Sequence, residues 1–325
     1  MPNCTTSSPP PVAPILPGSH EGWTQSYRLQ NKRLGAVIVP SIGRLVFFGP
    51  NDGPNALRVD PALRGQSPAE TDLFFNVGGN WVWPVSQSRW KDLSPGGSDW
   101  PPPAPLADRP WNASAWTDAE GAQCGLLSRE YGAPLFVKVS RLFRLDPESD
   151  ALFVRQCIER TAPSLVPVSL WTISQTDWAD LIAMPVDSSS KFPRGVKSLL
   201  GEDPSGELDF CGDIAVFRSS ASGETKLGSD SSRGWIAAAR GTNVLLMVVA
   251  GPAHSHGASF PDGGCVVELF ANPKLRYSEI ETLGPELDLA PGTVVENAFW
   301  LSLHALPGTV SPESFANYLR TLLGQ

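Results

Sequence analysis

Short runs of β-branched and aromatic residues, separated by Gly, Pro, Asn and Asp, recur along the chain from Trp23 onward, as in RLGAVIVPSIGRLVFFGP. This pattern is typical of antiparallel strands joined by tight turns. Long amphipathic helices do not alternate with these runs, which argues against a parallel α/β sheet. The pattern therefore predicts an all-β fold, a large antiparallel β-sandwich. Further runs lie at residues 135–145, 151–160, 166–175, 214–217, 234–240, 244–250, 265–271, 276–283 and 294–304.

One helix is predicted, near the C-terminus. Ser311 is a suitable N-cap, Pro312 suits the first helical position, and Gly324 suits the end of the helix. Its apolar stripe consists of Phe315, Leu319, Leu322 and Leu323. We expect this helix to pack on the outside of the sandwich.

The Pro/Ser-rich residues 1–18 offer little apolar surface, so we expect them to be disordered or to act as a tether. No linker or internal repeat divides residues 19–325, which are predicted to form a single domain, although their number would also allow two. The segments 94–110 and 187–209 are rich in Pro, Gly or polar residues. Such long loops often carry function.

Composition narrows the classes of function. The formal net charge is −8, which disfavours nucleic acid and anionic membranes as partners. The longest apolar run, residues 244–251, is too short for a membrane span, so a soluble protein without integral membrane association is predicted. Cytoplasmic location is the default. The Ser/Pro-rich stretch after Cys4 also fits a periplasmic or lipid-tethered protein whose export signal was trimmed.

The five cysteines are odd in number and show no C-x-x-C spacing, so buried free thiols are expected rather than a zinc site or a disulfide framework. No metal or other cofactor is expected. His254 and His256 lie in a Gly/Ser/Pro loop, where a solvated loop is favoured over metal ligation. Motifs of serine hydrolases, nucleotide-binding loops and zinc peptidases are absent from the sequence.

The strand predicted at residues 276–283 places carboxylates among apolar residues. Tyr277, Glu279 and Glu281 fall on one face, because successive side chains of a strand point to opposite sides. Two carboxylates two positions apart stand roughly 7 Å from each other, so both could contact one sugar ring. The alternative is that this face is simply solvated.

A second candidate region is FFNVGGNWVWPVSQSRW, residues 74–90. Alternation puts Trp81, Trp83 and, if the strand continues past Pro84, Gln87 on one side. Indole faces beside the amide of Gln87 and the guanidinium of Arg89 suit sugar recognition, through stacking and fixed hydrogen bonds. The alternative is a hydrophobic cluster of indoles under a loop.

Several segments resemble the last part of a galactose-mutarotase-like domain, of the aldose 1-epimerase superfamily. They are VELFANP with Glu268 and Asn272, RYSEIETLGPELDLAPG, and the strand containing Trp300. The resemblance implies a large antiparallel sandwich and makes Glu281, followed by Thr282, the match to the catalytic carboxylate. It also places the Gly-Gly pair before the tryptophans at the mouth of the ligand site.

The stretch PVSLWTISQTDWAD is similar to the epimerase strand that carries a catalytic histidine, but Gln175 stands at the comparable place. A glutamine amide can hold a hydroxyl group, but it cannot protonate a ring oxygen at neutral pH. The resemblance is therefore to a branch that lacks the epimerase histidines.

Three hypotheses of function follow from these residues. The first is a carbohydrate-binding protein that acts on a sugar or only holds it, in a concave cleft lined by Trp81, Trp83, Gln87, Arg89, Gln175, Tyr277, Glu279 and Glu281. The second is an aldose 1-epimerase-type isomerase with Glu281 as general base and Glu279 beside it. The third is a catalytically inactive interaction module. The sequence identifies neither the sugar nor the oligomeric state.

Overall fold

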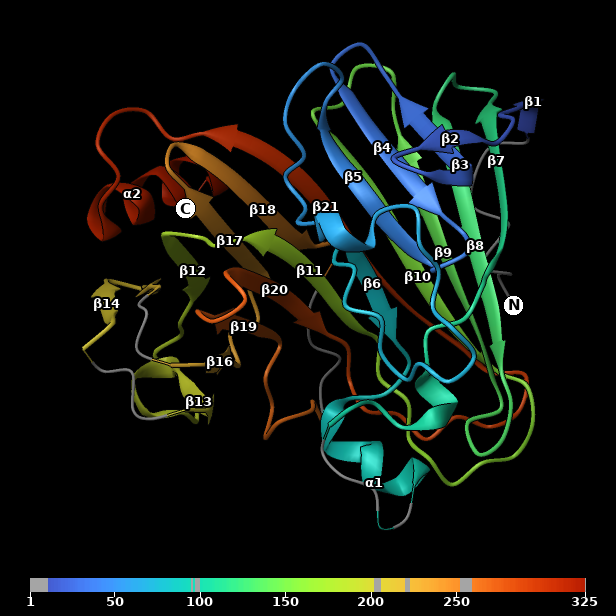
Figure 1. Cartoon of the computed structure of the whole chain (residues 1–325). Coiled ribbons are helices and arrows are strands. Elements are labelled where there is room, and N and C mark those ends of the chain that lie inside the picture. Colours follow the sequence, from blue (N-terminus) through green and yellow to red (C-terminus); the bar gives the residue numbers. More distant parts are fainter. Residues whose placement is uncertain are drawn as a thin grey trace.

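The computed structural model describes residues 11–94, 96, 100–201, 206–219, 223–251 and 259–324. Within these residues the chain forms two large antiparallel sheets (Figure 1). The predicted all-β sandwich is confirmed. The first sheet has 11 strands in the order β1 (Pro11–Pro14), β7 (Asn112–Asp118), β8 (Gln123–Tyr131), β9 (Val137–Leu145), β10 (Ala151–Arg160), β21 (Val294–Ala305), β18 (Asn243–Val249), β17 (Trp235–Arg240), β12 (Leu181–Pro185), β15 (Ile214–Arg218) and β14 (Leu208–Cys211).

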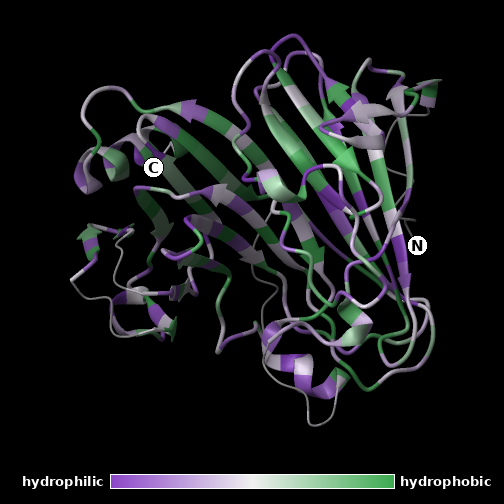
Figure 2. Cartoon of the chain, viewed as in Figure 1, coloured by the Kyte–Doolittle hydropathy of each residue, from purple (hydrophilic) through white to green (hydrophobic). Residues whose placement is uncertain are grey.

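The second sheet carries the candidate site. It has 10 strands among the described residues, in the order β13 (Lys197–Leu200), β16 (Thr225–Ser229), β19 (Val267–Asn272), β20 (Tyr277–Leu283), β11 (Trp171–Asp177), β6 (Asn80–Trp83), β5 (Arg44–Pro50), β4 (Leu34–Val39), β3 (Trp23–Gln30) and β2 (Gly18–His20). Figure 2 shows hydrophobic and hydrophilic residues alternating along many of these strands, as expected for strands with two different faces.

The main core lies between the two sheets. Leu29 and Ile38 of the second sheet contact β8 of the first at Gly125, where an added Cβ would lie 2.5 Å from Ile38 Cδ1. Polar groups between the sheets are also paired. The Thr172 hydroxyl of β11 and the Gln156 amide of β10 form a 2.7 Å hydrogen bond. These contacts identify the face of β11 with Thr172 as the inner face, so the residues that alternate with Thr172 point outward.

The C-terminal helix α2 (Pro312–Leu323) is confirmed. The Ser311 side chain accepts a hydrogen bond from the Ser314 backbone N–H, and Gly324 ends the helix in the left-handed conformation, with a φ of 67°. Phe315 and Leu319 pack on the outer face of the first sheet, in a cluster that includes Trp235. None of the described helices is long and apolar enough to cross a membrane.

The N-terminal segment differs from the expectation within the described residues. Pro11–Pro14 pairs with β7, and the Ile15 backbone N–H donates to the Ala115 carbonyl at 2.8 Å. Strand pairing and the packing of Ile15 against the main core supply the contacts that composition alone did not indicate. Residues 1–10 lie outside the described residues, so the expectation of disorder there remains a prediction.

The two long segments contain short elements rather than loop alone. The first segment, residues 94–110, contains η3 (Ala104–Leu106). It is preceded by η2 (Gln87–Arg89) and α1 (Trp90–Leu93). The second segment contains η4 (Pro193–Gly195) and β13. Cys124, Cys211 and Cys265 are free thiols; Cys124 and Cys265 are buried, as expected, whereas Cys211 is half-buried. The expectation is wrong for Cys157, which is disulfide-bonded, because spacing along the chain does not show which thiols a fold brings within bonding distance.

Candidate functional site

The outer face of the second sheet brings together most of the candidate residues. β20 pairs with β11 on one side and with β19 on the other, so that Glu279 lies opposite Gln175 and Glu281 lies opposite Glu268. Alternation along β20 is as predicted, with Tyr277 on the face of the two glutamates. Three neighbouring strands therefore place acidic, amide and aromatic side chains on one surface.

A buried carboxylate–lysine cluster, formed by Glu268, Glu281 and Lys226, lies at the centre of this face. Lys226 Nζ of β16 is 2.9 Å from Glu268 Oε2 and 3.2 Å from Glu281 Oε2. Trp171 Nε1 donates to Glu281 Oε2 at 2.5 Å, and Lys226 Nζ lies 4.5 Å from the centroid of the Trp171 ring. Both glutamates are 0% exposed. Lys226 was not among the predicted site residues.

Some polar atoms of this face have no partner among the described residues. Glu281 Oε1 and Glu268 Oε1 accept no hydrogen bond, and the buried indole N–H groups of Trp81 and Trp90 donate none. A buried polar group without a partner costs about 1–3 kcal/mol. These acceptors and donors are of the kind that hydroxyl groups of a ligand can satisfy.

Burial, together with neighbouring charges, shifts the pKa values of Glu268 and Lys226 in the cluster and of Glu279 beside it. Burial raises the pKa of Glu268 to about 8, against the opposing charge of Lys226. Burial and the neighbouring charge of Glu281 raise the pKa of Glu279 to about 8. Burial lowers the pKa of Lys226, but the charges of Glu268 and Glu281 outweigh burial and raise it overall. The Lys226 ammonium group thus faces two carboxyl groups, and burial favours the protonated form of Glu268.

These pKa values predict that stability falls as pH rises. A carboxyl group whose pKa is raised on folding binds more protons in the folded state, so its contribution is complete below the unfolded value of about 4.5 and is lost as pH passes the folded value. Between pH 5 and 8 the free energy of unfolding is expected to fall, by on the order of 1 kcal/mol per pH unit for each such group. Chemical denaturation at fixed ionic strength measures this slope.

The variant Glu279→Gln should have a shallower slope than the wild type, because its amide does not titrate. Glu130→Gln, at an exposed position of β8, is the matched control and should keep the wild-type slope. Equal slopes for Glu279→Gln and the wild type would contradict a raised pKa of Glu279.

Gln175 holds Glu279 in place. Its Nε2 donates to Glu279 Oε1 at 2.7 Å and to Asn76 Oδ1 at 2.9 Å. Arg58 Nη1 donates to Gln175 Oε1 at 3.3 Å, and the Arg58 guanidinium lies 5.1 Å from the centroid of the Tyr277 ring. Gln175 is fully buried, so its amide positions a carboxyl group. Asn76 and Arg58 were not among the predicted residues.

The tryptophans form an aromatic cluster, made of Trp81, Trp83, Trp90 and Trp171. The ring centroid of Trp83 lies 5.7 Å from that of Trp81, 5.4 Å from that of Trp90 and 5.0 Å from that of Trp171. Trp81 and Trp83 are each only 4% exposed, and the Arg44 guanidinium lies 4.2 Å from the centroid of a Trp81 ring. The indole rings therefore pack largely against one another. This is the arrangement expected if these tryptophans form a hydrophobic cluster rather than a stacking surface for a sugar.

Gln87 and Arg89 are not on the sheet. β6 ends at Trp83, before Pro84, which has no N–H to continue a strand ladder, and both residues lie on η2. Arg89 binds Glu286 with two hydrogen bonds, from Nε to Oε1 at 3.0 Å and from Nη2 to Oε2 at 3.2 Å. Arg89 therefore lies at the side of the face rather than among the glutamates.

The described histidines lie away from the glutamates. His20 is on β2, the last strand of the second sheet, and its ring centroid lies 5.9 Å from that of Phe47. His304 of β21 lies in the other sheet, with its Nε2 2.8 Å from Ser302 Oγ. His254 and His256 lie outside the described residues. Within the described part of the chain no group of three or more His, Cys, Asp or Glu residues is placed to hold a metal ion.

Solved structures with the same fold support the sequence resemblance. A candidate aldose 1-epimerase from Escherichia coli K12 matches with a TM-score of 0.57 and 15% identity, over 87% of this chain and 99% of that one. A galactose mutarotase-like protein from Lactobacillus casei matches with a TM-score of 0.55 and 11% identity, over 86% of this chain and 100% of that one. A galactose mutarotase related enzyme from Lactobacillus acidophilus has a TM-score of 0.55 and 10% identity, with coverage of 88% and 100%.

The fold is therefore that of the galactose-mutarotase-like proteins, as the resemblance implied. The sequence matches no protein-family model. A search among curated proteins also finds no match. Identities of this size establish the fold and leave the activity to be argued from the site.

Proposed function

We propose that this protein binds a carbohydrate on the outer face of β6, β11 and β20, with Glu281 at the centre of the site. The observation that carries the proposal is the carboxylate–lysine cluster, whose buried oxygens Glu281 Oε1 and Glu268 Oε1 have no partner among the described residues. Sugar hydroxyl groups are donors of the required kind. The fold is consistent with a carbohydrate ligand.

The geometry also supports a chemical role, as an alternative to binding alone. Exchange of anomers needs a base that takes the proton of the anomeric hydroxyl group and an acid that protonates the ring oxygen. Glu281, held by Lys226 and Trp171, is the proposed base. Glu279, two positions away on the same face, has a pKa raised to about 8 by burial and can supply the proton that Gln175 cannot. The pair would serve an aldose 1-epimerase-type isomerase.

Sugar binding is expected to change the indole fluorescence of the protein, because Trp81, whose indole N–H has no partner among the described residues, and the neighbouring Trp83 belong to the same face as Glu281. Trp83→Phe should reduce this response while it preserves an aromatic ring in a position that is only 4% exposed. Fluorescence titration with a panel of mono- and oligosaccharides, followed by calorimetry, measures both effects.

Trp235→Phe is the matched control, since Trp235 is also buried but packs under α2 on the other sheet. It should leave the sugar-induced response intact. If no sugar of a broad panel binds by calorimetry, the carbohydrate proposal fails and the interaction module replaces it.

A further inference from the structure

An apolar pocket of about 380 Å³ opens at one end of the sandwich, between the two sheets. One wall is a row of residues across three strands of the first sheet, in which Ala238 of β17 pairs with Leu245 of β18, and Leu245 pairs with Leu303 of β21. The other wall includes Thr176, near the end of β11, and Ala56, in the segment after β5. We call this cavity the end pocket. Its volume is within the range of small-molecule sites.

The end pocket is separate from the proposed sugar face. Thr176 shares the inner face of β11 with Thr172, whereas Gln175 points outward and donates to Glu279. The pocket therefore lies on the opposite side of the second sheet from the glutamates. None of the residues proposed to contact the sugar lines it.

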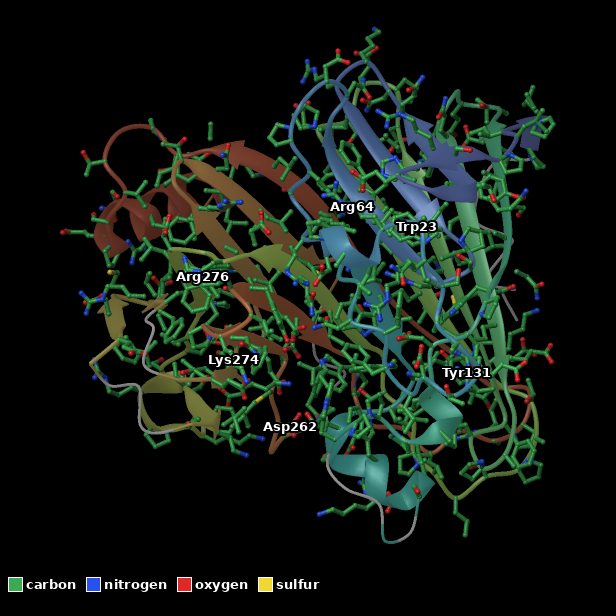
Figure 3. All side chains as sticks on the ribbon, viewed as in Figure 1. Trp23, Arg64, Tyr131, Asp262, Lys274 and Arg276 are labelled. Atoms are coloured by element: carbon green, nitrogen blue, oxygen red, sulfur yellow. The ribbon has the colours of Figure 1, made fainter. Side chains whose placement is uncertain are left out.

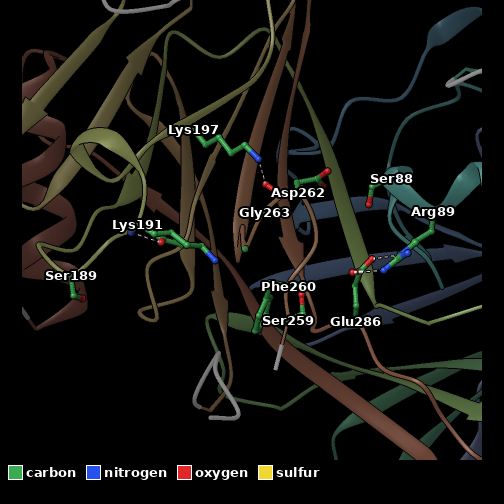
Figure 4. Close-up of a pocket in the computed structure, with 12 residues that line it drawn as sticks. Ser88, Arg89, Ser189, Lys191, Lys197, Ser259, Phe260, Asp262, Gly263 and Glu286 are labelled. Carbon is green, nitrogen blue, oxygen red and sulfur yellow. Dashed lines mark hydrogen bonds and ion pairs between the residues drawn. The ribbon is translucent and has the colours of Figure 1, made fainter. Parts of the chain in front are cut away.

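The end pocket also differs from a larger pocket, of about 630 Å³, that lies between the loops before β19 and after β20 (Figure 4). The larger pocket is polar, and its three cationic and three anionic side chains balance one another. They are Arg89, Lys191, Lys197, Asp230, Asp262 and Glu286. Apolar side chains instead form most of the lining of the end pocket.

Small side chains leave the space of the end pocket open. On the inner face of β17, Ile236 is followed by Ala238 toward the pocket, and the buried Ala179 lines it after β11. Leu303 and Ala56 pack against the main core but are only half-buried. Protein interiors are normally close-packed, so an apolar space of this size at the edge of the core can accept a ligand.

The lining of the end pocket has no net charge at neutral pH. Its carboxylate, Asp177, and its guanidinium, Arg240, form an ion pair between β11 and β17, and both side chains are more than half exposed. They therefore lie at the mouth. Burial lowers the pKa of His304, so its imidazole is uncharged at pH 7. Because an unpaired charge is costly to remove from water, this lining favours an uncharged ligand over an ion.

We propose that the end pocket binds a small uncharged molecule with an apolar body, such as a single ring that carries a hydroxyl group. The alanine and leucine side chains would cover the ring, since the removal of apolar surface from water is favourable. The hydroxyl group would lie near the mouth, where the Asn243 amide and the His304 imidazole offer donors and acceptors. This site goes beyond the proposed carbohydrate function and does not depend on it.

Benzyl alcohol, benzoate and benzylamine test the choice of an uncharged ligand, because they share one ring and are respectively neutral, negative and positive at pH 7. Titration of the full chain, followed by NMR, measures their affinities. We expect benzyl alcohol to bind with a Kd of about 1 mM or lower, and each ion to bind about 10-fold or more weakly. Equal affinities for the three compounds, or no binding of benzyl alcohol up to about 10 mM, would overturn the inference.

Two variants on opposite walls test the location of the site. Ala56→Leu and Ala238→Leu each fill part of the end pocket and should weaken the binding of benzyl alcohol about 10-fold or more. Ala113→Leu on β7 is the matched control, because Ala113 is also half-buried against the main core but does not line the pocket. It should bind as the wild type does. Thermal unfolding identifies which variants are folded, and wild-type affinity in a folded wall variant would reject the site.

Arg240→Gln tests the mouth of the end pocket. It leaves Asp177 without its cation, so the affinity for benzylamine relative to benzoate should rise by about 2–5-fold, as expected for an exposed charge. Arg276→Gln is the matched control, because Arg276 is an exposed arginine of the turn between β19 and β20 (Figure 3). It should leave the ratio unchanged. An unchanged ratio in Arg240→Gln would contradict binding beside this ion pair.

Discussion

Replacing Lys226 with methionine is expected to lower the free energy of unfolding by about 3–5 kcal/mol at pH 9, because it leaves two buried carboxyl groups without their cation. Lys226 Nζ is the group that contacts both Glu268 Oε2 and Glu281 Oε2, and both glutamates are 0% exposed. The loss should be smaller at pH 5, where Glu268, whose pKa is raised to about 8 by burial, is already protonated. Denaturant unfolding at both pH values measures the difference.

The double variant Lys226→Met/Glu268→Gln should recover part of the loss at pH 9, since it removes one of the two uncompensated charges. Lys274→Met, at an exposed turn, is the control and should change stability by less than about 0.5 kcal/mol. A loss below about 1 kcal/mol for Lys226→Met, or a loss that does not depend on pH, would show that the ion pairs do not stabilise the face as described.

Replacing Glu281 with glutamine is expected to lower any mutarotation activity by about 100-fold or more, while ligand binding is largely kept. Glutamine retains an oxygen that can accept from Trp171 Nε1, but its amide cannot take up a proton at neutral pH. The wild-type activity on simple aldoses is itself expected to be weak, because Gln175 stands where the family resemblance leads one to expect histidine. Polarimetry on fresh α-anomers measures the rate.

Glu130→Gln is the control, because it removes a carboxylate from β8, a strand of the other sheet. Its rate should match that of the wild type. Fast mutarotation that survives Glu281→Gln would show that another group is the base. Loss of binding together with activity would instead assign Glu281 to holding the ligand.

The strands of the site were largely predictable, because their sequences alternate or are rich in β-branched residues. Residues 276–283 were predicted and β20 spans Tyr277–Leu283. Residues 112–131, which form β7 and β8, were missed, since NASAWTD and QCGLLSREY contain few β-branched residues. Gly125 in β8 makes room for Ile38 of the other sheet, and such a contact between distant segments cannot be found from local periodicity.

The site was predictable only within single strands. Alternation placed Glu279 and Glu281 on one face, and register across the sheet then decided their partners. Lys226 is 42 residues before Glu268 and lies in TKLGS, a short stretch without a clear strand pattern. The position of Arg89 was also not predictable from strand alternation. The strand ends before Pro84, and Arg89 lies on the short helix η2 that follows.

The short N-terminal strands have a consequence for how the protein behaves at high concentration. β1 is the last strand of one sheet, and β2 is the last strand of the other, so a single segment of about ten residues covers one open edge of each sheet. Pro11 and Pro14 offer no N–H to a further strand. At the β1 edge these prolines disfavour the edge-to-edge association by which exposed strands recruit other chains into aggregates, while the opposite edges of the two sheets are formed by β14 and β13.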